Sequence, residues 1–526
     1  TPKSSAWKLT PDKPVPGIAW PEATDTQRVF TGGRSNVIMS ATPSPFMLTG
    51  IGNDGLLNAF VYNIESKSEF GERITSKTKG KFALSPNGKT FAVIPQGKNS
   101  TVTVFSAETG KELYTQDVVE GSPYSSHLVY RSPDELVYIG KGTIEGTSQG
   151  IIRILNAQTG KTISSTYDKD FTQPDKCILS PQGRYLIFYG SKFRAFDLAN
   201  AAFAGEVAIP SSSGVYSCNG LVFNSDGTQL CGLFSGASGL AVLYFDFKNG
   251  SILEQVKIPW SSSVMTDSMF YGQPLQFLRD GAYILIEGQL LVEKATQKVV
   301  WMLNILPTND PYRFINSAPR FVAGDRVIVL NGPSDGFQFH DYPVNFDEII
   351  ARTQAARSDE PALLKPGSGN VSVVINIDQT RFAEKEQTRQ KILEVIGNQL
   401  QVMGLTIAEN ADLALTIDYT EAPGHTLQLR SIGLGSTDQN GKTVQITKFV
   451  MKYALKLKDQ PVFSRDVTLD PSVMSFRGET NEQAAREQGF EQALNELRGI
   501  PLPWYADNST PPKTLPIVET MQTEGY

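Results

Sequence analysis

The sequence predicts an all-β propeller with four-stranded blades, followed by a smaller α+β domain with an antiparallel sheet and two helices. Three observations support this prediction. Short apolar runs separated by turns recur along the first two thirds of the chain, the recurring turns are almost evenly spaced, and the character of the sequence changes near residue 346.

Residues 81–115 show the recurring block most clearly. Short runs rich in β-branched and aromatic residues alternate with polar turns, which is the pattern of antiparallel strands joined by hairpins. We expect four strands, at residues 82–84, 91–94, 101–105 and 113–115. These strands would form one small sheet, and further copies of the sheet would cover its apolar faces.

Both turns of the block recur. The first, Ser-Pro-Asn-Gly, has relatives at residues 180–183, 224–227 and 278–281, and weaker ones at 132–135 and 323–326. The second, Ala-Glu-Thr-Gly-Lys at 107–111, is repeated at 157–161 and more faintly within 245–250 and 293–298. Successive first turns lie about 44 to 54 residues apart, close to the period of a propeller blade. With a degenerate first unit at 44–46, we expect seven blades between residues 27 and 346, whereas six would omit the first unit or the last.

These motifs resemble those of the bacterial WD40/YVTN-like β-propellers over the first two thirds of the chain. The resemblance implies a seven-bladed ring and says little about function, because the residues that carry it form turns. Glycine supplies a positive φ, while Asn, Asp and Ser bond their own backbone. The second turn is also similar to that of quinoprotein propellers, where a Trp follows; only Val299-Val300-Trp301 has that Trp here.

The candidate binding site is a loop. In a propeller, the loops between strands two and three and the loops between blades share one face, and the long irregular connections of this sequence, residues 141–149 among them, fall there. Residues 260–272, WSSSVMTDSMFYG, are unusually apolar for a connection and contain Trp260, Met265, Met269, Phe270 and Tyr271. Loops on rigid scaffolds carry function, and aromatic residues and Met are enriched at contacts. Two alternatives remain open: the loop binds a partner, or it folds back and plugs the central channel.

The sequence after residue 346 predicts a linker, a second domain and a tail. Residues 347–370 are polar and end in Lys-Pro-Gly-Ser-Gly-Asn, which is typical of a linker. Residues 371–500 are expected to form an α+β domain, and the Pro/Thr-rich tail 501–526 is expected to be extended and to pack on another surface or on a second subunit. In the domain we expect a strand, a helix, four antiparallel strands and a closing helix capped by Thr480, at residues 371–377, 384–403, 413–419, 426–434, 443–457, 462–469 and 481–497.

Residues 404–407 and 410–419, GLTI and NADLALTIDY, are similar to bacterial envelope domains. The family comprises the N-terminal domain of TolB and domains of curli-assembly-type lipoproteins. The resemblance implies a periplasmic or extracellular protein that binds other proteins. Residues 1–26 are polar and Pro-rich, and we interpret them as an extended segment left after removal of a signal peptide or membrane tether, or as an expression boundary.

The composition limits the classes of partner that the chain is expected to bind. The net charge of −6 offers no basic field, so we expect no nucleic-acid partner. No apolar run approaches the ~18–20 residues that span a bilayer. Cys177, Cys218 and Cys231 are too few for a disulfide scaffold, and we expect Cys218 and Cys231 to be buried thiols, although their offset positions on one hairpin leave a bridge open.

No catalytic, cofactor or metal site is predicted. His127, His340 and His425 are far apart and none has a neighbour at metal-ligand spacing. No G-x-S-x-G elbow and no P-loop occurs. We therefore expect a non-catalytic scaffold protein of a bacterial cell envelope that binds proteins or surface polymers. The alternative is a propeller enzyme (a hydrolase, a lyase or a quinoprotein-like enzyme) with its site over the central channel.

Overall fold

The structure is a computed structural model. It describes residues 7–13, 27–31, 38–39, 44–51, 57–66, 68–76, 80–95, 101–118, 122–144, 146–169, 176–190, 192–224, 226–236, 239–258, 275–306, 320–322, 325–331, 336–356, 369–428, 443–471, 481–498, 500, 502–507, 509 and 512–522. The chain divides into two compact units. The first holds the strands before residue 298 and those between residues 320 and 343, and the second holds the strand that starts near residue 299 and everything from residue 346 onwards.

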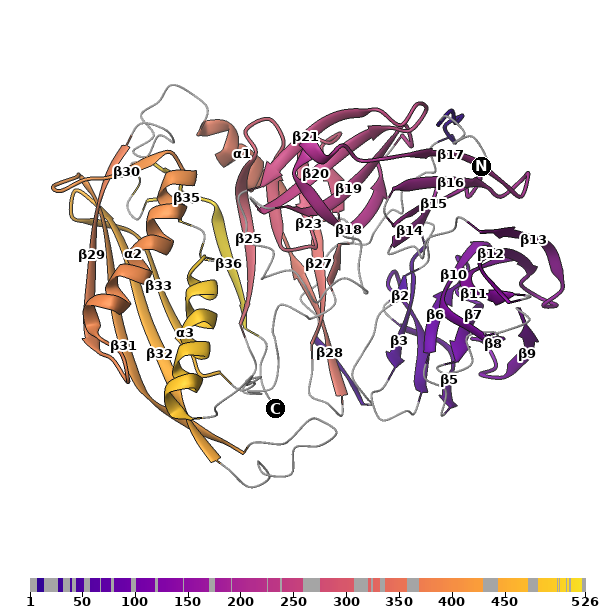
Figure 1. Cartoon of the computed structure of the whole chain (residues 1–526), viewed down its shortest axis with the longest axis horizontal. Coiled ribbons are helices and arrows are strands. Elements are labelled where there is room, and N and C mark those ends of the chain that lie inside the picture. Colours follow the sequence, from indigo (N-terminus) through magenta and orange to yellow (C-terminus); the bar gives the residue numbers. More distant parts are fainter. Residues whose placement is uncertain are drawn as a thin grey trace. The chain divides into compact units, whose positions relative to one another are not determined.

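The first unit is a β-propeller-like ring of six four-stranded antiparallel sheets (Figure 1). Five of them use four strands that are consecutive in the chain. These are β2–β5 (Ile38–Met39, Phe46–Ile51, Leu57–Asn63, Ser68–Ser76), β6–β9 (Gly80–Leu84, Thr90–Pro95, Thr101–Ser106, Glu112–Asp117), β10–β13 (Ser122–Ser132, Glu135–Ile144, Thr147–Asn156, Thr162–Asp168), β14–β17 (Lys176–Leu179, Tyr185–Tyr189, Phe193–Asp197, Ala202–Val207) and β18–β21 (Val215–Phe223, Gln229–Gly236, Gly239–Asp246, Ile252–Ile258).

The sixth sheet closes the ring. It combines β26 (Arg320–Val322), β27 (Arg326–Asn331) and β28 (Gly336–Pro343) with β1 (Gln27–Thr31), which pairs antiparallel with β28. Since β1 comes from the start of the chain and β28 from the end of the repeats, their hydrogen bonds join the two ends. Closure of this kind leaves the ring without a free first or last sheet.

The predicted block at residues 81–115 is confirmed, because its four runs are β6, β7, β8 and β9 in antiparallel order. Between the sheet of β18–β21 and β26, the chain forms three further antiparallel strands, β22 (Leu275–Leu278), β23 (Tyr283–Ile286) and β24 (Leu290–Glu293). The prediction that residues 141–149 form a long irregular connection is wrong. There β11 and β12 remain paired up to Ile144 and Thr147, since their β-branched residues extend the hairpin.

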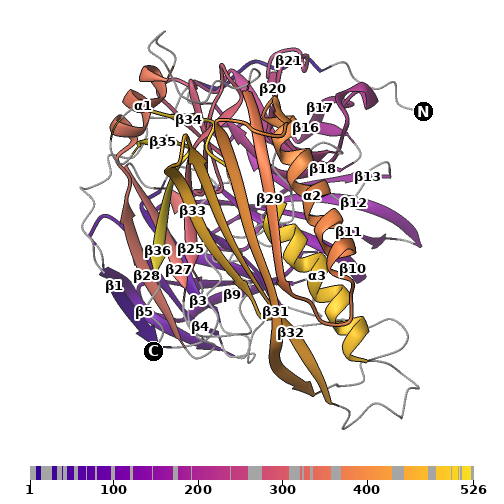
Figure 2. The ribbon, with the colours of Figure 1, turned by 90° about the vertical axis from the view of Figure 1, so that its left-hand side faces the viewer.

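The second unit contains a five-stranded sheet in the order β30-β29-β31-β32-β33, with helices α2 and α3 beside it (Figure 2). The elements are β29 (Gly369–Gln379), α2 (Lys385–Val402), β30 (Leu405–Ile407), β31 (Leu413–Gln428), β32 (Thr443–Leu457), β33 (Gln460–Leu469) and α3 (Glu482–Arg498). Alternate strand residues such as Leu415, Ile417 and Met451 share one buried core with Ile396 and Leu494 of the helices. The period of two on the strands therefore separates an apolar face from a polar one.

The expected antiparallel sheet of this domain is wrong in one part. Strand β29 runs parallel to β30 and β31, and only β31–β33 are antiparallel. The reason is helix α2, because a strand–helix–strand crossover returns the chain in the same direction. The strand expected at 413–419 and the described part of the one expected at 426–434 are one long strand, β31, whose pairing with β32 shifts between Pro423 and Thr426. The cap of α3 is Asn481, whose Oδ1 accepts from the N–H of Ala484 at 2.8 Å.

The segment expected to be a linker begins with helix α1, Phe346–Ala355, which buries Phe346, Ile349 and Thr353. The tail is extended, as expected, and forms the strands β34 (Tyr505–Ala506), β35 (Thr514–Leu515) and β36 (Ile517–Gln522). Within the second unit, β36 runs parallel to β25 (Lys298–Leu306). The tail thus packs on a strand of its own chain.

Candidate functional site

The loop predicted to bind a partner lies outside the described residues, which resume at Leu275 after residue 258. Trp260, Met265, Met269, Phe270 and Tyr271 therefore remain a sequence prediction. The geometry of the described residues directs attention to other places where the protein holds an extended segment.

The three histidines lie in different parts of the fold. His127 is in β10 and His340 in β28 of the first unit, whereas His425 is in β31 of the second. The Nδ1 atom of His425 lies 2.8 Å from Oδ1 of Asp470. Across the part of the chain that the structure describes, no three His, Cys, Asp or Glu side chains gather as metal ligands would. None of the described helices is both long and apolar enough to cross a membrane.

All three cysteines are described by the structure and none forms a disulfide; Cys218 and Cys231 are buried. This confirms the expectation for that pair. The register explains it, because Cys218 pairs with Phe234 and Cys231 pairs with Val222. The two thiols therefore do not face each other across the strands.

The first unit holds residues 7–12 of its own chain against two neighbouring sheets, β14–β17 and β18–β21. We call this place the seam. Trp7 is 6% exposed and Leu9 4%, and both belong to a core cluster contributed by those two sheets. The side-chain Nε1–H of Trp7 donates to the carbonyl oxygen of Phe247 at 2.7 Å, and the ring meets that of Phe247 edge-on. The main-chain N–H of Leu9 donates to the carbonyl oxygen of Lys248 at 2.9 Å.

The other end of the segment is fixed by Asp12, a carboxylate that is 9% exposed. One of its oxygens, Oδ2, accepts hydrogen bonds from the turn at residues 180–183 and from the residue that follows it. The donors are the hydroxyl of Ser180, the main-chain N–H of Gln182 at 3.0 Å and the main-chain N–H of Arg184 at 3.4 Å. A buried carboxylate needs such partners, because burial without them costs several kcal/mol, about 2–7 for a polar group alone. The segment is therefore recognised at two points by specific polar groups.

Two glycines make room for the segment. A Cβ added at Gly205 of β17 would lie 2.7 Å from Cα of Trp7, and one added at Gly250 would lie 2.9 Å from the Trp7 ring. Contacts under 3.0 Å require something to move, and at Gly205 the obstacle is main chain. Any larger side chain at Gly205 would therefore displace the segment.

The second unit holds the tail in a related way. The Nε1–H of Trp301 in β25 donates to Oε2 of Glu519 in β36 at 2.9 Å. The Nε1–H of Trp504 donates to the carbonyl oxygen of Val299 at 2.7 Å. The first bond adds to the parallel pairing of β25 with β36, and the second attaches the residue before β34 to β25.

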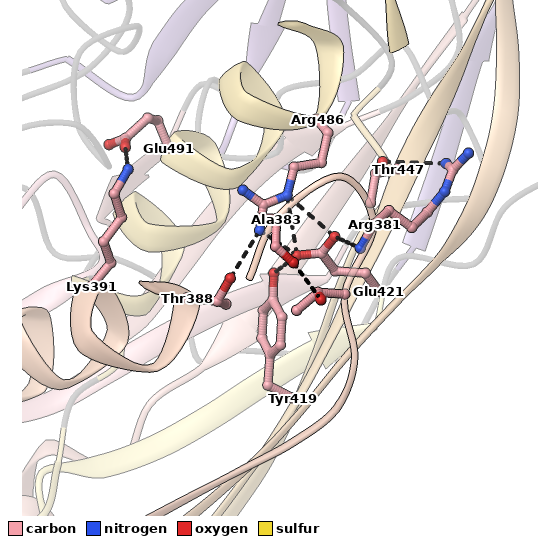
Figure 3. Close-up of polar contacts among 10 residues, drawn as sticks. Arg381, Ala383, Thr388, Lys391, Tyr419, Glu421, Thr447, Arg486 and Glu491 are labelled. Atoms are coloured by element: carbon pink, nitrogen blue, oxygen red, sulfur yellow. Dashed lines mark hydrogen bonds and ion pairs between the residues drawn. The ribbon is translucent and has the colours of Figure 1, made fainter. Parts of the chain in front are cut away.

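The second unit also contains a buried polar network (Figure 3). Glu421 of β31 is fully buried. Its carboxylate accepts hydrogen bonds from Nη2 of Arg486 at 2.5 Å, from the hydroxyl of Tyr419 at 2.7 Å and from the main-chain N–H of Arg381 at 2.6 Å. Arg486 also donates to the hydroxyl of Thr388 in α2 at 3.2 Å. Burial and the adjacent carboxylate raise the pKa of Tyr419 well above its usual value. With no exposed acceptor or donor at its centre, this network links α2, α3 and the sheet and offers no access to a substrate.

The seam was not predicted from the sequence. Trp7 and Leu9 stand out as apolar residues in a polar, Pro-rich stretch, and that contrast is a signal that could have indicated a docked segment. It could not have indicated where the segment docks, because the two sheets that bind it lie about 170 to 240 residues further along the chain.

The comparisons with known proteins give no assignment. The search of family models found no match, and no curated protein is significantly similar to the chain. Functional inference therefore rests on the geometry described above.

Proposed function

We propose that this chain is a non-catalytic binding and scaffold protein of a bacterial cell envelope, with protein segments or surface polymers as its partners. Its platform is a seven-bladed, WD40/YVTN-like propeller in which the repeat of β22–β24 provides the seventh blade. The protein acts in the periplasm or outside the cell, and the domain similar to TolB and curli-assembly lipoproteins contributes to binding.

The observation that best supports this proposal is the seam. There the first unit binds an extended polypeptide segment through one indole, one carboxylate and the main chain. Sheet-rich scaffolds that recognise peptides use this combination, in which main-chain bonds give affinity and a few side chains give specificity. A protein that can hold its own segment in this way has the surface chemistry needed to hold a foreign one.

The test is capture followed by reconstitution. The full chain is immobilised and exposed to bacterial envelope extracts, and each captured protein or polymer is purified and titrated against the full chain by calorimetry. We expect at least one purified partner to bind with a defined stoichiometry. Turnover of a small substrate by the full chain, together with no partner that binds when purified, would instead support the propeller-enzyme alternative.

The predicted loop supplies a matched pair of variants. We expect Trp260→Ala with Tyr271→Ala to weaken partner binding at least ~10-fold, because buried aromatic anchors dominate interface energies. The control is Tyr216→Ala, since Tyr216 is an aromatic residue in β18 that is 67% exposed. Loss of the folded state in the loop variant, with the control folded, would show that the loop plugs the channel.

A further inference from the structure

We propose that the seam is a peptide-recognition site for segments of the form Trp-x-Leu-x-x-Asp, which residues 7–12 occupy as an intramolecular ligand. This inference rests on the proposed function and names the ligand chemistry of one of its surfaces. In the sheets β6–β9 and β18–β21, side chains of the sheet itself fill places equivalent to those that Trp7 or Asp12 takes at the seam.

In the sheet of β6–β9, a residue of the sheet itself fills the position that Trp7 takes at the seam. Tyr114 of β9 pairs with Val104, donates through its hydroxyl to the carbonyl oxygen of Ala157 in the next sheet at 3.1 Å, and lies on Gly160 of that turn. The corresponding residue of β17 pairs with Ala195 and is Gly205.

The seam therefore lacks this aromatic ring, and Trp7 supplies it. Phe247 and Gly250 hold the same places in their turn as Ala157 and Gly160 hold in theirs. The Trp7 indole donates to the carbonyl oxygen of Phe247 and lies on Gly250, as Tyr114 does with Ala157 and Gly160 two interfaces earlier.

The position of Asp12 is also filled elsewhere by the turn itself. In the turn at residues 85–88, Oδ1 of Asn87 accepts from the hydroxyl of Ser85 at 2.9 Å and from the N–H of Lys89 at 3.0 Å. In the turn at residues 224–227, Oδ1 of Asp226 accepts from the N–H of Thr228 at 2.8 Å. A short side chain with a terminal oxygen at the third turn position thus binds the turn's own donors.

The turn at the seam has Gln182 at that third position, and its side chain is one methylene longer. There Oδ2 of Asp12 accepts from the hydroxyl of Ser180 and from the main-chain N–H of Arg184. These two donors occupy the same turn positions as the two that bond to Asn87. The seam thus lacks a ring like that of Tyr114 and a turn acceptor like Asn87 or Asp226, and the segment brings both. A peptide is selected by whether it carries them five residues apart.

The experiment uses the chain of residues 14–526 and a fluorescein-labelled peptide of residues 5–13, with fluorescence anisotropy as the measurement. We expect saturable binding to this shortened chain, and at least ~10-fold weaker apparent binding to the full chain, whose own segment competes. Trp7→Ala in the peptide should weaken binding more than ~100-fold, as expected for the loss of a buried indole. Asp12→Asn should weaken it about 10-fold, and Lys8→Ala, at an exposed position, should change it less than about 2-fold.

Two protein variants test the comparison of repeats directly. Gly205→Tyr gives β17 the ring that Tyr114 supplies in β9, and Gln182→Asn gives the turn the acceptor that Asn87 supplies in its own turn. We expect the first to abolish peptide binding and the second to weaken it about 10-fold, with the thermal unfolding temperature of each equal to or above that of the shortened chain. Unchanged affinity in both variants would overturn the proposal.

Folding is checked with a second form, the full chain with Trp7→Ala and Asp12→Asn, which should also bind the labelled peptide. A folded shortened chain that binds no peptide at 1 mM would overturn the proposal, as would loss of folding in both forms, because the segment would then be an integral part of the fold. The capture experiment above uses the full chain with its seam occupied. A partner found there would support the proposed function even if this site fails, and peptide binding would stand without any captured partner.

Discussion

The buried network of the second unit permits a sharp stability prediction. Replacing Glu421 by Gln keeps the shape of the side chain and removes its charge, while one acceptor oxygen becomes a donor amide. Both carboxylate oxygens are used, one by Tyr419 and Arg486 and the other by Arg381 and Arg486. Whichever oxygen is replaced, a donor then faces a donor, and the guanidinium loses its counter-charge at a site that is 6% exposed.

The expected cost is that of breaking a buried ion pair, about 3–5 kcal/mol of unfolding free energy. The matched control is Glu482→Gln, the same chemical change in a residue that pairs with Arg381 at 3.3 Å but is 45% exposed. That change should cost less than about 1 kcal/mol, because water screens the pair. Lys391 and Glu491, 3.4 Å apart between α2 and α3, are exposed to a similar extent and should contribute as little (Figure 3).

Calorimetric unfolding of the full chain, with hydrogen exchange of α2 and α3 peptides, is the assay. We expect Glu421→Gln to lower the transition of the second unit and to speed exchange in both helices, while β6–β9 exchange as before. Adding Arg486→Met should cost less than the sum of the two single changes, since both remove one interaction. Equal effects of Glu421→Gln and Glu482→Gln would refute the reasoning, because burial would then make no difference.

Three further predictions concern single side chains. Tyr114→Phe removes a bond between two sheets and should cost about 0.5–1.5 kcal/mol at pH 8. Burial raises the pKa of Tyr114 from 10.0 to about 12, so between these pH values the folded state keeps a proton that the unfolded state loses. The contribution of Tyr114 to stability is therefore complete below pH 10 and is lost as the pH rises towards 12. The difference in urea midpoint between wild type and variant should narrow over that range. Desolvation raises the pKa of the Cys177 thiol to about 11, so iodoacetamide at pH 8 should alkylate it ~100-fold more slowly in the folded chain than in urea, and equal rates would contradict the raised pKa. Trp301→Phe removes the bond to Glu519 and should speed hydrogen exchange in β36 at least several-fold while α3 is unchanged; exchange that stays the same would mean that main-chain pairing alone holds the tail.

Much of the fold could be predicted because its determinants are local. The Gly88 and Gly183 turns need a positive φ, and both glycines have φ of +70°. The apolar runs around such turns became β6–β9 and their counterparts. Local pattern failed where pairing partners are distant, as for the parallel pairing of β29 with β31, or where two short predicted strands merged into β31.

The two candidate sites also differ in whether the local sequence could indicate them. The apolar load of residues 260–272 was evident from composition alone and still awaits a test. The seam was not evident, although Trp7 and Asp12 are in plain view in the sequence. They form a site because Gly205 stands where β9 has Tyr114, and Gln182 stands where another turn has Asn87. These differences can be recognised only when the repeats are compared in space.

The sequence alone determined the repeated sheet, its turns and the change to an α+β domain, because glycine conformation, side-chain alternation and β-propensity act within a few residues. Only the tertiary structure decided that β1 completes the sheet of β26–β28, that the tail adds to β25, and that residues 7–12 complete the seam. These contacts join residues more than 160 positions apart. Their strength comes from hydrogen bonds and burial between surfaces that exist only after each partner has folded, and no local pattern encodes such a pairing.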